Sequence, residues 1–121
     1  MKYLLDTNQV VFYLRNNQSV VEGLELLRTD GLAISIISVA ELYEGVYRST
    51  NSSATESVLL NFLRELSILG IDDGICRIFG QERTRLRSLG MPLSDLDLLI
   101  ASTGLYYGLI LVTNDKGVRP G

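Results

Sequence analysis

Histidine is absent from the 121 residues of this chain. Its absence excludes Ser-His-Asp triads, Cys-His pairs, acid-base catalysis by imidazole and His-ligated zinc. Cysteine occurs once, at Cys76, which excludes an internal disulfide and any cysteine-rich metal site. Because Cys76 stands among apolar residues at helical spacing, we expect it to lie in the core. Any chemistry must therefore rest on carboxylates, hydroxyls, Lys, Arg, Tyr or a bound metal.

Positive charge is also scarce. The 14 Asp and Glu residues outnumber the 11 Lys and Arg residues, so the net charge is −3 and the pI is near 4.8. A protein that holds nucleic acid by counterion release alone is usually strongly basic. If the substrate is a polyanion, a metal ion or a partner must therefore supply positive charge at the site.

Long apolar runs are missing as well. The uncharged apolar run over residues 32–40 is far shorter than the roughly 20 residues that span a bilayer. Asp6 interrupts the N-terminal apolar run before it could form the core of a signal peptide. These observations predict a cytoplasmic protein with no membrane segment.

The length is enough for one domain with a single core and too short for two. Hydrophobic residues make up 46% of the chain, which is high for a domain of this size. We therefore expect part of the apolar surface to close a homo-oligomer or a partner interface.

Short β-prone runs alternate with helical patterns along the chain, which predicts an α/β domain with a parallel sheet. Two serines, Ser19 and Ser38, each stand three residues before a glutamate, at the spacing of a capping box, so a helix is expected to begin at each. The low-complexity stretch 49–55 (STNSSAT) is expected to be a mobile loop. The expected strands are 2–6, 32–37, 68–71 and 109–113, and the other expected helices are 8–15, 55–66, 72–89 and 95–107.

Four acids stand at strand ends or near helix starts. Asp6 ends the first strand and Asp115 the last, Glu41 opens the helix after the second strand, and Asp97 lies in the most apolar helix. Ligands of open α/β sheets bind at the carboxyl ends of the strands, so we expect these acids at one edge. An unpaired buried carboxylate at Asp97 would need a partner or a cation. A capping box alone could explain Glu41, a turn could explain Asp115, and a helix dipole suits Asp95.

Several carboxylates at one edge would repel each other strongly without counterions. Carboxylate-only clusters suit hard divalent cations, so the predicted ligand is Mg²⁺ or Mn²⁺. Such a metal can generate a hydroxide nucleophile and stabilise a phosphate during in-line displacement. This route to phosphodiester hydrolysis needs no histidine.

The segments that carry these acids resemble the motifs of the PIN-domain family, and within it the VapC-type toxins of bacterial toxin–antitoxin pairs. Each motif is weak alone, but all four occur in order at ordinary spacing, and together they span nearly the whole chain. The matching segments are residues 3–8 (YLLDTN), 37–43 (ISVAELY, followed by Gly45 and Val46), 95–101 (DLDLLIA) and 111–115 (LVTND).

The resemblance implies one PIN-like domain over residues 1–121, a three-layer α/β/α fold and a parallel sheet of strand order 3-2-1-4. It also implies an endoribonuclease that depends on Mg²⁺ or Mn²⁺, forms a homodimer and is neutralised by a small antitoxin protein. The acids that carry over as catalytic residues and metal ligands are Asp6, Glu41, Asp97 and Asp115, with Asn8 and Thr113 as polar supports and Asp95 as a possible fifth acid.

The end of the sequence departs from the family pattern. Family members usually continue past the fourth motif with an Asp-Phe-like pair and a further strand, whereas this sequence runs Lys116-Gly117-Val118-Arg119-Pro120-Gly121. We therefore expect the fifth strand to be missing and Asp115 to be held less firmly.

Two other functions remain open. The first is a PIN-fold interaction module with impaired catalysis, which would show no stabilisation by Mg²⁺ or Mn²⁺. The second is a phosphatase similar to the haloacid dehalogenases, whose nucleophile is also a strand-end Asp. That family requires a second Asp two residues later, where this chain has Asn8.

Overall fold

The computed structural model describes residues 1–113 and 119–120, and a parallel sheet forms its centre. The central strand β1 pairs in parallel with β2 on one side and β4 on the other, and β2 pairs in parallel with β3. The order 3-2-1-4 expected from the resemblance is therefore confirmed. The strands are β1 Tyr3–Leu5, β2 Leu32–Ser35, β3 Ser67–Leu69, β4 Ile110–Val112 and β5 Arg119–Pro120.

The expected absence of a fifth strand is wrong. The two-residue β5 pairs antiparallel with β4, with Pro120 opposite Ile110 and Arg119 opposite Leu111. β4 would otherwise be the edge of the sheet, and an edge strand offers free backbone groups to any segment that can reach it. The short C-terminal segment is long enough to supply that partner.

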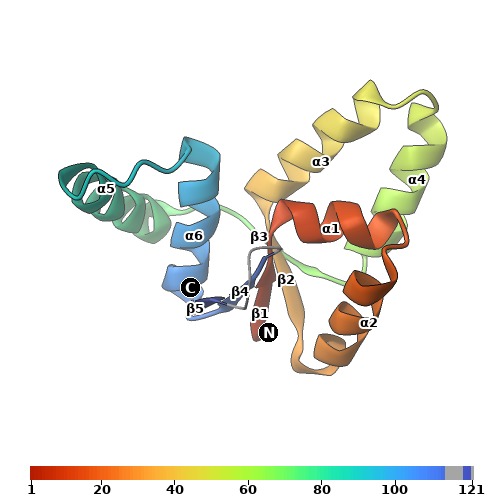
Figure 1. Ribbon diagram of the computed structural model, residues 1–121, viewed down its shortest axis with the longest axis horizontal. Helices are drawn as coiled ribbons and strands as arrows, with labels where there is room; N and C mark the ends of the chain where they lie inside the picture. Colours follow the sequence, from red (N-terminus) through yellow and green to blue (C-terminus); the bar gives the residue numbers. More distant parts are fainter. Residues whose placement is uncertain (114–118, 121) are drawn as a thin grey trace.

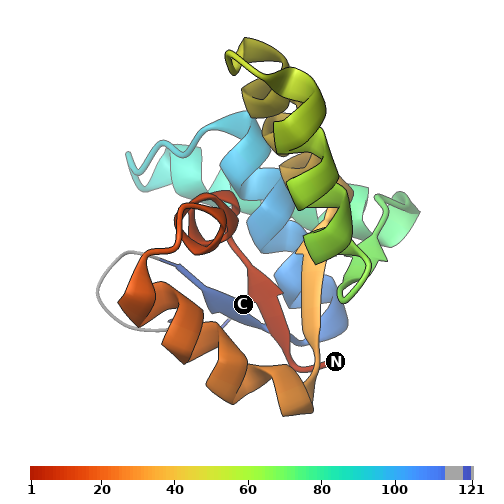
Figure 2. The same cartoon turned by 90° about the vertical axis from the view of Figure 1, so that its right-hand side faces the viewer.

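Helices cover both faces of the sheet. Figures 1 and 2 show α1, α2 and α4 on one face, α6 on the other with α5 outside it, and α3 rising from the end of β2. This arrangement confirms the three-layer α/β/α fold. The helices are α1 Thr7–Leu14, α2 Gln18–Leu27, α3 Ile36–Arg48, α4 Ser52–Leu63, α5 Asp73–Ser88 and α6 Asp95–Tyr107, with a 3₁₀ turn, η1, at Arg28–Asp30.

Side chains of the central strands alternate between two cores. Leu5 and Ile34 belong to the core beneath α1–α4, whereas Leu4 and Ala33 belong to a smaller core with Ile100 of α6. This period of two is the ordinary geometry of a strand, and burial on both faces explains why the strands are apolar at nearly every position. Together the two cores fix the sheet edge at which Asp6 lies.

Two expected helix starts are wrong, and both helices begin earlier. Asn17, not Ser19, caps α2, because its side chain accepts a hydrogen bond from the Val20 N–H. Ser35, not Ser38, caps α3, because its hydroxyl accepts from the Ile37 N–H at 3.0 Å. The second strand therefore stops at residue 35 rather than 37, and neither predicted capping box forms.

The stretch 49–55 is not the loop expected from its composition. Asn51 caps α4, which begins at Ser52, so only the residues around Thr50 separate α3 from α4. Asn and Ser favour helix N-caps as strongly as they favour loops, and the composition does not distinguish the two. As a result α3 and α4 form a tight helical hairpin that projects beyond the sheet (Figure 1).

The last two helices match their expected positions closely. α5 is capped by Asp72, and α6 has the predicted bounds. Cys76 of α5 is exposed, so the expectation that it lies in the core is wrong. α5 packs chiefly on α6 and turns its other faces to solvent. Within residues 1–113 and 119–120, none of the helices combines the length and apolar character needed to cross a bilayer.

Candidate active site

Asp6 lies where β1 meets α1 at the carboxyl edge of the sheet. Its backbone N–H donates to the Val112 carbonyl of β4 at 2.9 Å, and its carbonyl accepts from Gln9 in α1. Its carboxylate caps α1 by accepting from the Thr7 N–H at 2.9 Å. Backbone contacts on both sides therefore hold the half-buried Asp6 at the centre of the edge.

Glu41 reaches the same edge from α3, through Thr7. The Thr7 hydroxyl lies 2.6 Å from the Glu41 Oε1 and 2.8 Å from the fully buried Ser38 Oγ. Because a hydroxyl carries one proton, Thr7 donates to the carboxylate, and its oxygen accepts a hydrogen bond from the Ser38 hydroxyl. Glu41 is thus oriented by the residue that follows Asp6 in sequence.

The acids influence one another electrostatically. Burial raises the pKa of the Asp6 carboxyl, and the negative charges of Asp97 and Glu41 raise it further. Hydrogen bonds from the Thr7 N–H and the Thr113 hydroxyl lower the pKa but do not outweigh these effects. Three elements, β1, α3 and α6, therefore bring like charges within range of one another.

Asp97 is exposed, so the expectation that it is buried in its helix is wrong. α6 buries side chains on more than one of its faces, Leu98 and Ile100 among them, but its first turn lies at the surface. Asp95 forms an ion pair with Arg83 of α5, and its part as a fifth acid stays a prediction. That ion pair fastens α5 to the start of α6.

The remaining predicted site residues differ in how closely they approach Asp6. The Thr113 hydroxyl lies 3.4 Å from the Asp6 Oδ2, whereas the Thr7 N–H donates to Oδ1. Asn8 is exposed and lines a cleft beside the acids. Asp115 lies outside the described residues, so its predicted part in the site stays a prediction.

The donors in the described part of the site are all oxygen atoms, from carboxylates and hydroxyls. Among residues 1–113 and 119–120, no three acids lie close enough together to bind a metal ion as a group. Asp6, Glu41 and Asp97 nevertheless interact through their charges. The donor set matches hard divalent cations in kind.

A cleft of about 720 Å³ opens beside the acids. Thr7, Asn8 and Glu41 form one end of it, and its walls come from α1, α3 and α4. Its lining combines apolar side chains such as Val11 and Leu42 with charged groups. The acid edge therefore opens into a cleft that is large enough for part of a substrate or an inhibitor.

Two residues of the site were not identified from sequence. Thr7 orients Glu41, and Ser38 supports Thr7, although the sequence pattern assigned Ser38 to a helix cap. One signal was available: Ser38 and Glu41 are three residues apart and so share one face of a helix. Their contact with Thr7, 31 and 34 residues away in sequence, could not be deduced from spacing.

The sequence and structural comparisons identify the class of protein. Residues 3–119 match the family described as PIN domain. The chain therefore belongs to the PIN-domain family, as its fold and the order of its acidic motifs indicate.

Among its relatives are proteins named as VapC ribonucleases. Ribonuclease VapC2 from Rickettsia felis is 37% identical, over 95% of this chain and 87% of the relative. The tRNA(fMet)-specific endonuclease VapC from Salmonella typhimurium is 30% identical, with the same shares of the two chains. A crystal structure of VapBC2 from Rickettsia felis, bound to a DNA fragment from their promoter, matches with a TM-score of 0.89 at 36% identity, covering 95% of this chain and 88% of that one.

Proposed function

We propose that this chain is an endoribonuclease of the VapC type, dependent on Mg²⁺ or Mn²⁺ and neutralised by a small antitoxin. The observation that carries the proposal is that Thr7 joins two acids at the sheet edge, its N–H donating to Asp6 and its hydroxyl to Glu41. Relatives named as ribonucleases, which align over nearly the whole chain, support the same activity. Nothing in the family match supports the phosphatase alternative.

The proposed metal ligands are Asp6 and Asp97, with Glu41 and Asp115 completing the set. A divalent ion held there would supply an activated water and neutralise charge on the scissile phosphate. The protein's own part is to position the acids. Thr7 holds the Glu41 carboxylate, and the hydroxyl of Thr113 contacts the Oδ2 of Asp6.

The first test is RNA cleavage with and without metal. Because the donors are carboxylates, we expect cleavage with Mn²⁺ or Mg²⁺, loss of cleavage in excess EDTA, and recovery when metal is restored. Thermal unfolding of the same protein should shift to higher temperature with Mn²⁺, since a ligand that binds the folded state stabilises it. Undiminished cleavage in EDTA would exclude the metal mechanism. Neither cleavage nor stabilisation by metal would instead support the interaction module.

The proposed antitoxin would act on the acids and on the apolar surface together. An amphipathic helix could pack on the apolar surface and extend an Arg or Lys to the acids, so that its charge replaces that of the metal. We therefore expect antitoxin affinity to fall as Mg²⁺ rises. The measurement is a titration with a peptide from the C-terminal half of the cognate antitoxin, at low and high Mg²⁺ and constant ionic strength. Equal affinities would place the inhibitor away from the acids.

A homodimer is also proposed. Large apolar side chains are exposed near the start of α6 and in the segment before it, which fits the apolar interface expected from composition. Light scattering of the purified chain tests this, and a monomer at all concentrations would contradict it. The exposed side chains are Leu89, Met91, Leu93 and Leu96.

A further inference from the structure

The cleft beside the acids carries positive charge at its far end. Arg15 and Arg48 both line it, and among the described residues neither takes part in an ion pair. Four other arginines, Arg28, Arg77, Arg83 and Arg85, are paired with acids, whereas Arg64 and Arg87 lie outside the cleft and take part in none of the ion pairs of the described residues. The cleft therefore retains cations that the fold does not use.

The two arginines lie at comparable distances from the acids. Arg15 follows Thr7 by eight residues along α1, and Arg48 follows Glu41 by seven along α3. At a rise of about 1.5 Å per residue, each arginine is roughly 10–12 Å from the acid end along its helix. Both helices begin at the carboxyl edge of the sheet, and both arginines line the same cleft as Thr7 and Glu41.

An aromatic ring lies between the acids and the arginines. Phe12 lines the cleft on α1 and is 36% exposed, although its ring is apolar. Exposed aromatic rings combined with cations are the usual means of binding single-stranded nucleic acid, because bases stack on the rings and phosphates contact the cations. The order along the cleft is thus acids, ring and arginines.

We propose that this cleft binds a single-stranded segment of the RNA substrate, on one side of the scissile bond. Arg15 and Arg48 contact backbone phosphates, and Phe12 stacks on a base between them and the reaction centre. The inference rests on the proposed ribonuclease function. Two unpaired arginines favour a polyanion over a peptide, even though Glu44 also lines the cleft, since an apolar helix that carries a cation to the acids would not need them.

Gly45 makes the cleft accessible to a steric test. It lies within α3, lines the cleft, and a Cβ added to it would meet no atom within 4 Å. A side chain there would therefore begin in open space on the wall of the cleft, and we expect a longer one to extend into the cleft. Gly80 of α5 has the same open space where a Cβ would lie but is outside this cleft, so it offers a matched control.

The experiment measures kcat and KM with Mn²⁺ for single-stranded RNAs of increasing length. Arg15→Gln and Arg48→Gln should each raise KM about fivefold on long RNA and leave kcat within about twofold. Each should also reduce the slope of log KM against log salt by about 0.7. On oligonucleotides too short to reach the arginines, the variants should match the unaltered protein. Arg64→Gln removes the same charge from an exposed arginine outside the cleft and should change none of these values.

The steric variants give a second reading. Gly45→Met should raise KM on long RNA, whereas Gly80→Met should not, and neither should lower the unfolding temperature because glycine is unfavourable within helices. If the protein cleaves RNA while the Arg15, Arg48 and Gly45 variants keep the KM of their controls, the inference is wrong and the ribonuclease function stands. If these variants weaken only antitoxin binding, the inference is also wrong, and the cleft is assigned to the inhibitor instead of the RNA. An absence of metal-dependent cleavage by the unaltered protein would remove the function itself.

Discussion

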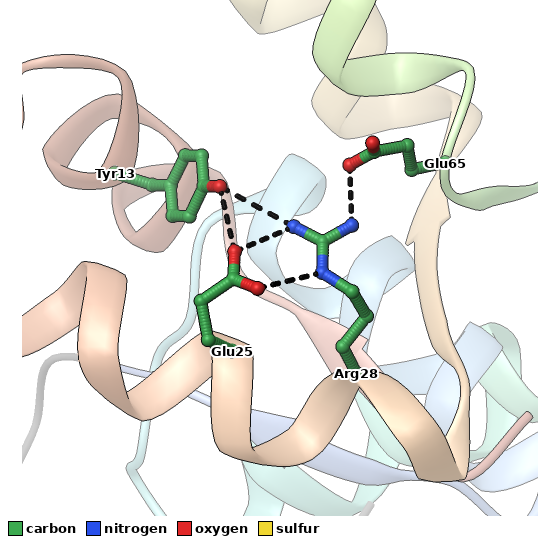
Figure 3. Close-up of polar contacts among 4 residues, drawn as sticks. All are labelled: Tyr13, Glu25, Arg28 and Glu65. Carbon is green, nitrogen blue, oxygen red and sulfur yellow. Dashed lines mark hydrogen bonds and ion pairs between the residues drawn. The ribbon is translucent and has the colours of Figure 1, made fainter.

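Two groups of charged residues lie near opposite ends of α1. The acids of the first group have no cationic partner among the described residues, whereas the acids of the second are paired with an arginine. At the start of α1, Asp6 feels the negative charges of Asp97 and Glu41, and the described residues contain no ion pair with any of the three. Near its end, Tyr13 joins a network in which Arg28 lies between Glu25 and Glu65 (Figure 3). Carboxylates are central to both groups.

The charge of Arg28 is balanced by two acids. Arg28 donates to both carboxylate oxygens of Glu25, at 2.8 and 3.1 Å, and forms an ion pair with Glu65. The Tyr13 hydroxyl donates to Glu25 at 2.9 Å, and its ring packs on Phe62 with centroids 4.6 Å apart. Hydrogen bonds from Arg28 and then from Tyr13 lower the pKa of Glu25. This network ties α1, α2, η1 and the end of α4 together.

The difference between the two groups distinguishes a structural cluster from a candidate site. A carboxylate whose pKa is lowered by partners stabilises the fold, whereas one whose pKa is raised by burial and like charge reduces stability while it is ionised. The second kind favours the binding of an external cation. Perturbed acids of this kind are typical of functional sites.

The strongest test of this comparison is Asp6→Asn. The amide keeps the shape and caps a helix as well as Asp does, but it removes a charged ligand. We expect RNA cleavage to fall by about two orders of magnitude or more. The apo protein should be equally stable or more stable at neutral pH, since a charge that its neighbours repel is gone.

The control for this variant is Asp30→Asn, which removes an exposed acid from η1 and should leave cleavage and stability unchanged. Cleavage and unfolding are measured on the same preparations. An Asp6→Asn protein that cleaves RNA normally and is less stable without metal would make Asp6 a structural acid.

A smaller effect is expected from Arg28→Met, which keeps an apolar stem but breaks the network. Because the Arg28 side chain is 28% exposed and its partners are more exposed, we expect a loss of about 1 kcal/mol in the free energy of unfolding. The loss should shrink at high salt, and cleavage should persist. Arg77→Met breaks a pair that is 77% and 82% exposed and should cost less. Equal losses in urea unfolding would show that the network adds nothing beyond a surface pair.

The smallest effects are the pH dependences of the two groups, which should have opposite signs. The pKa of Asp6 is raised above its ordinary 3.8, so the folded state binds this proton more tightly and Asp6 reduces stability as pH rises from 3.8 through the raised value. The pKa of Glu25 is lowered from 4.5, so its contribution is present above 4.5 and is lost as pH falls through the lowered value.

Unfolding temperatures of Asp6→Asn and Glu25→Gln from neutral pH down to pH 3 measure this contrast. At neutral pH, Asp6→Asn should unfold no lower than the unaltered apo protein, and Glu25→Gln should unfold lower. For both variants, the difference in unfolding temperature from the unaltered protein should become smaller as the pH is lowered. Gaps of the same sign at neutral pH would mean that the two carboxylates have similar environments, which contradicts the comparison.

Local patterns were sufficient for most of the architecture. An apolar run that ends in Asp6, and a helix that follows at once, place that acid at the sheet edge wherever the strand lies in the sheet. α6 was also located by its apolar pattern, and the structure shows that Ser94 caps its start and that Gly108 adopts the left-handed conformation at its end. Helix starts were less certain, because Asn17 and Ser19, or Ser35 and Ser38, are equally good caps when judged by residue type.

The sequence by itself determined the α/β class, the strand order implied by its family resemblance, and the set of acids proposed for the site. Only the tertiary structure decided which groups meet. α6 is apolar nearly all round, so its composition could not show that Asp97 faces solvent, and spacing could not show that Thr7 contacts Ser38 and Glu41. Residue type and period are properties of a segment alone, whereas exposure and contact depend on which face of that segment its neighbours cover.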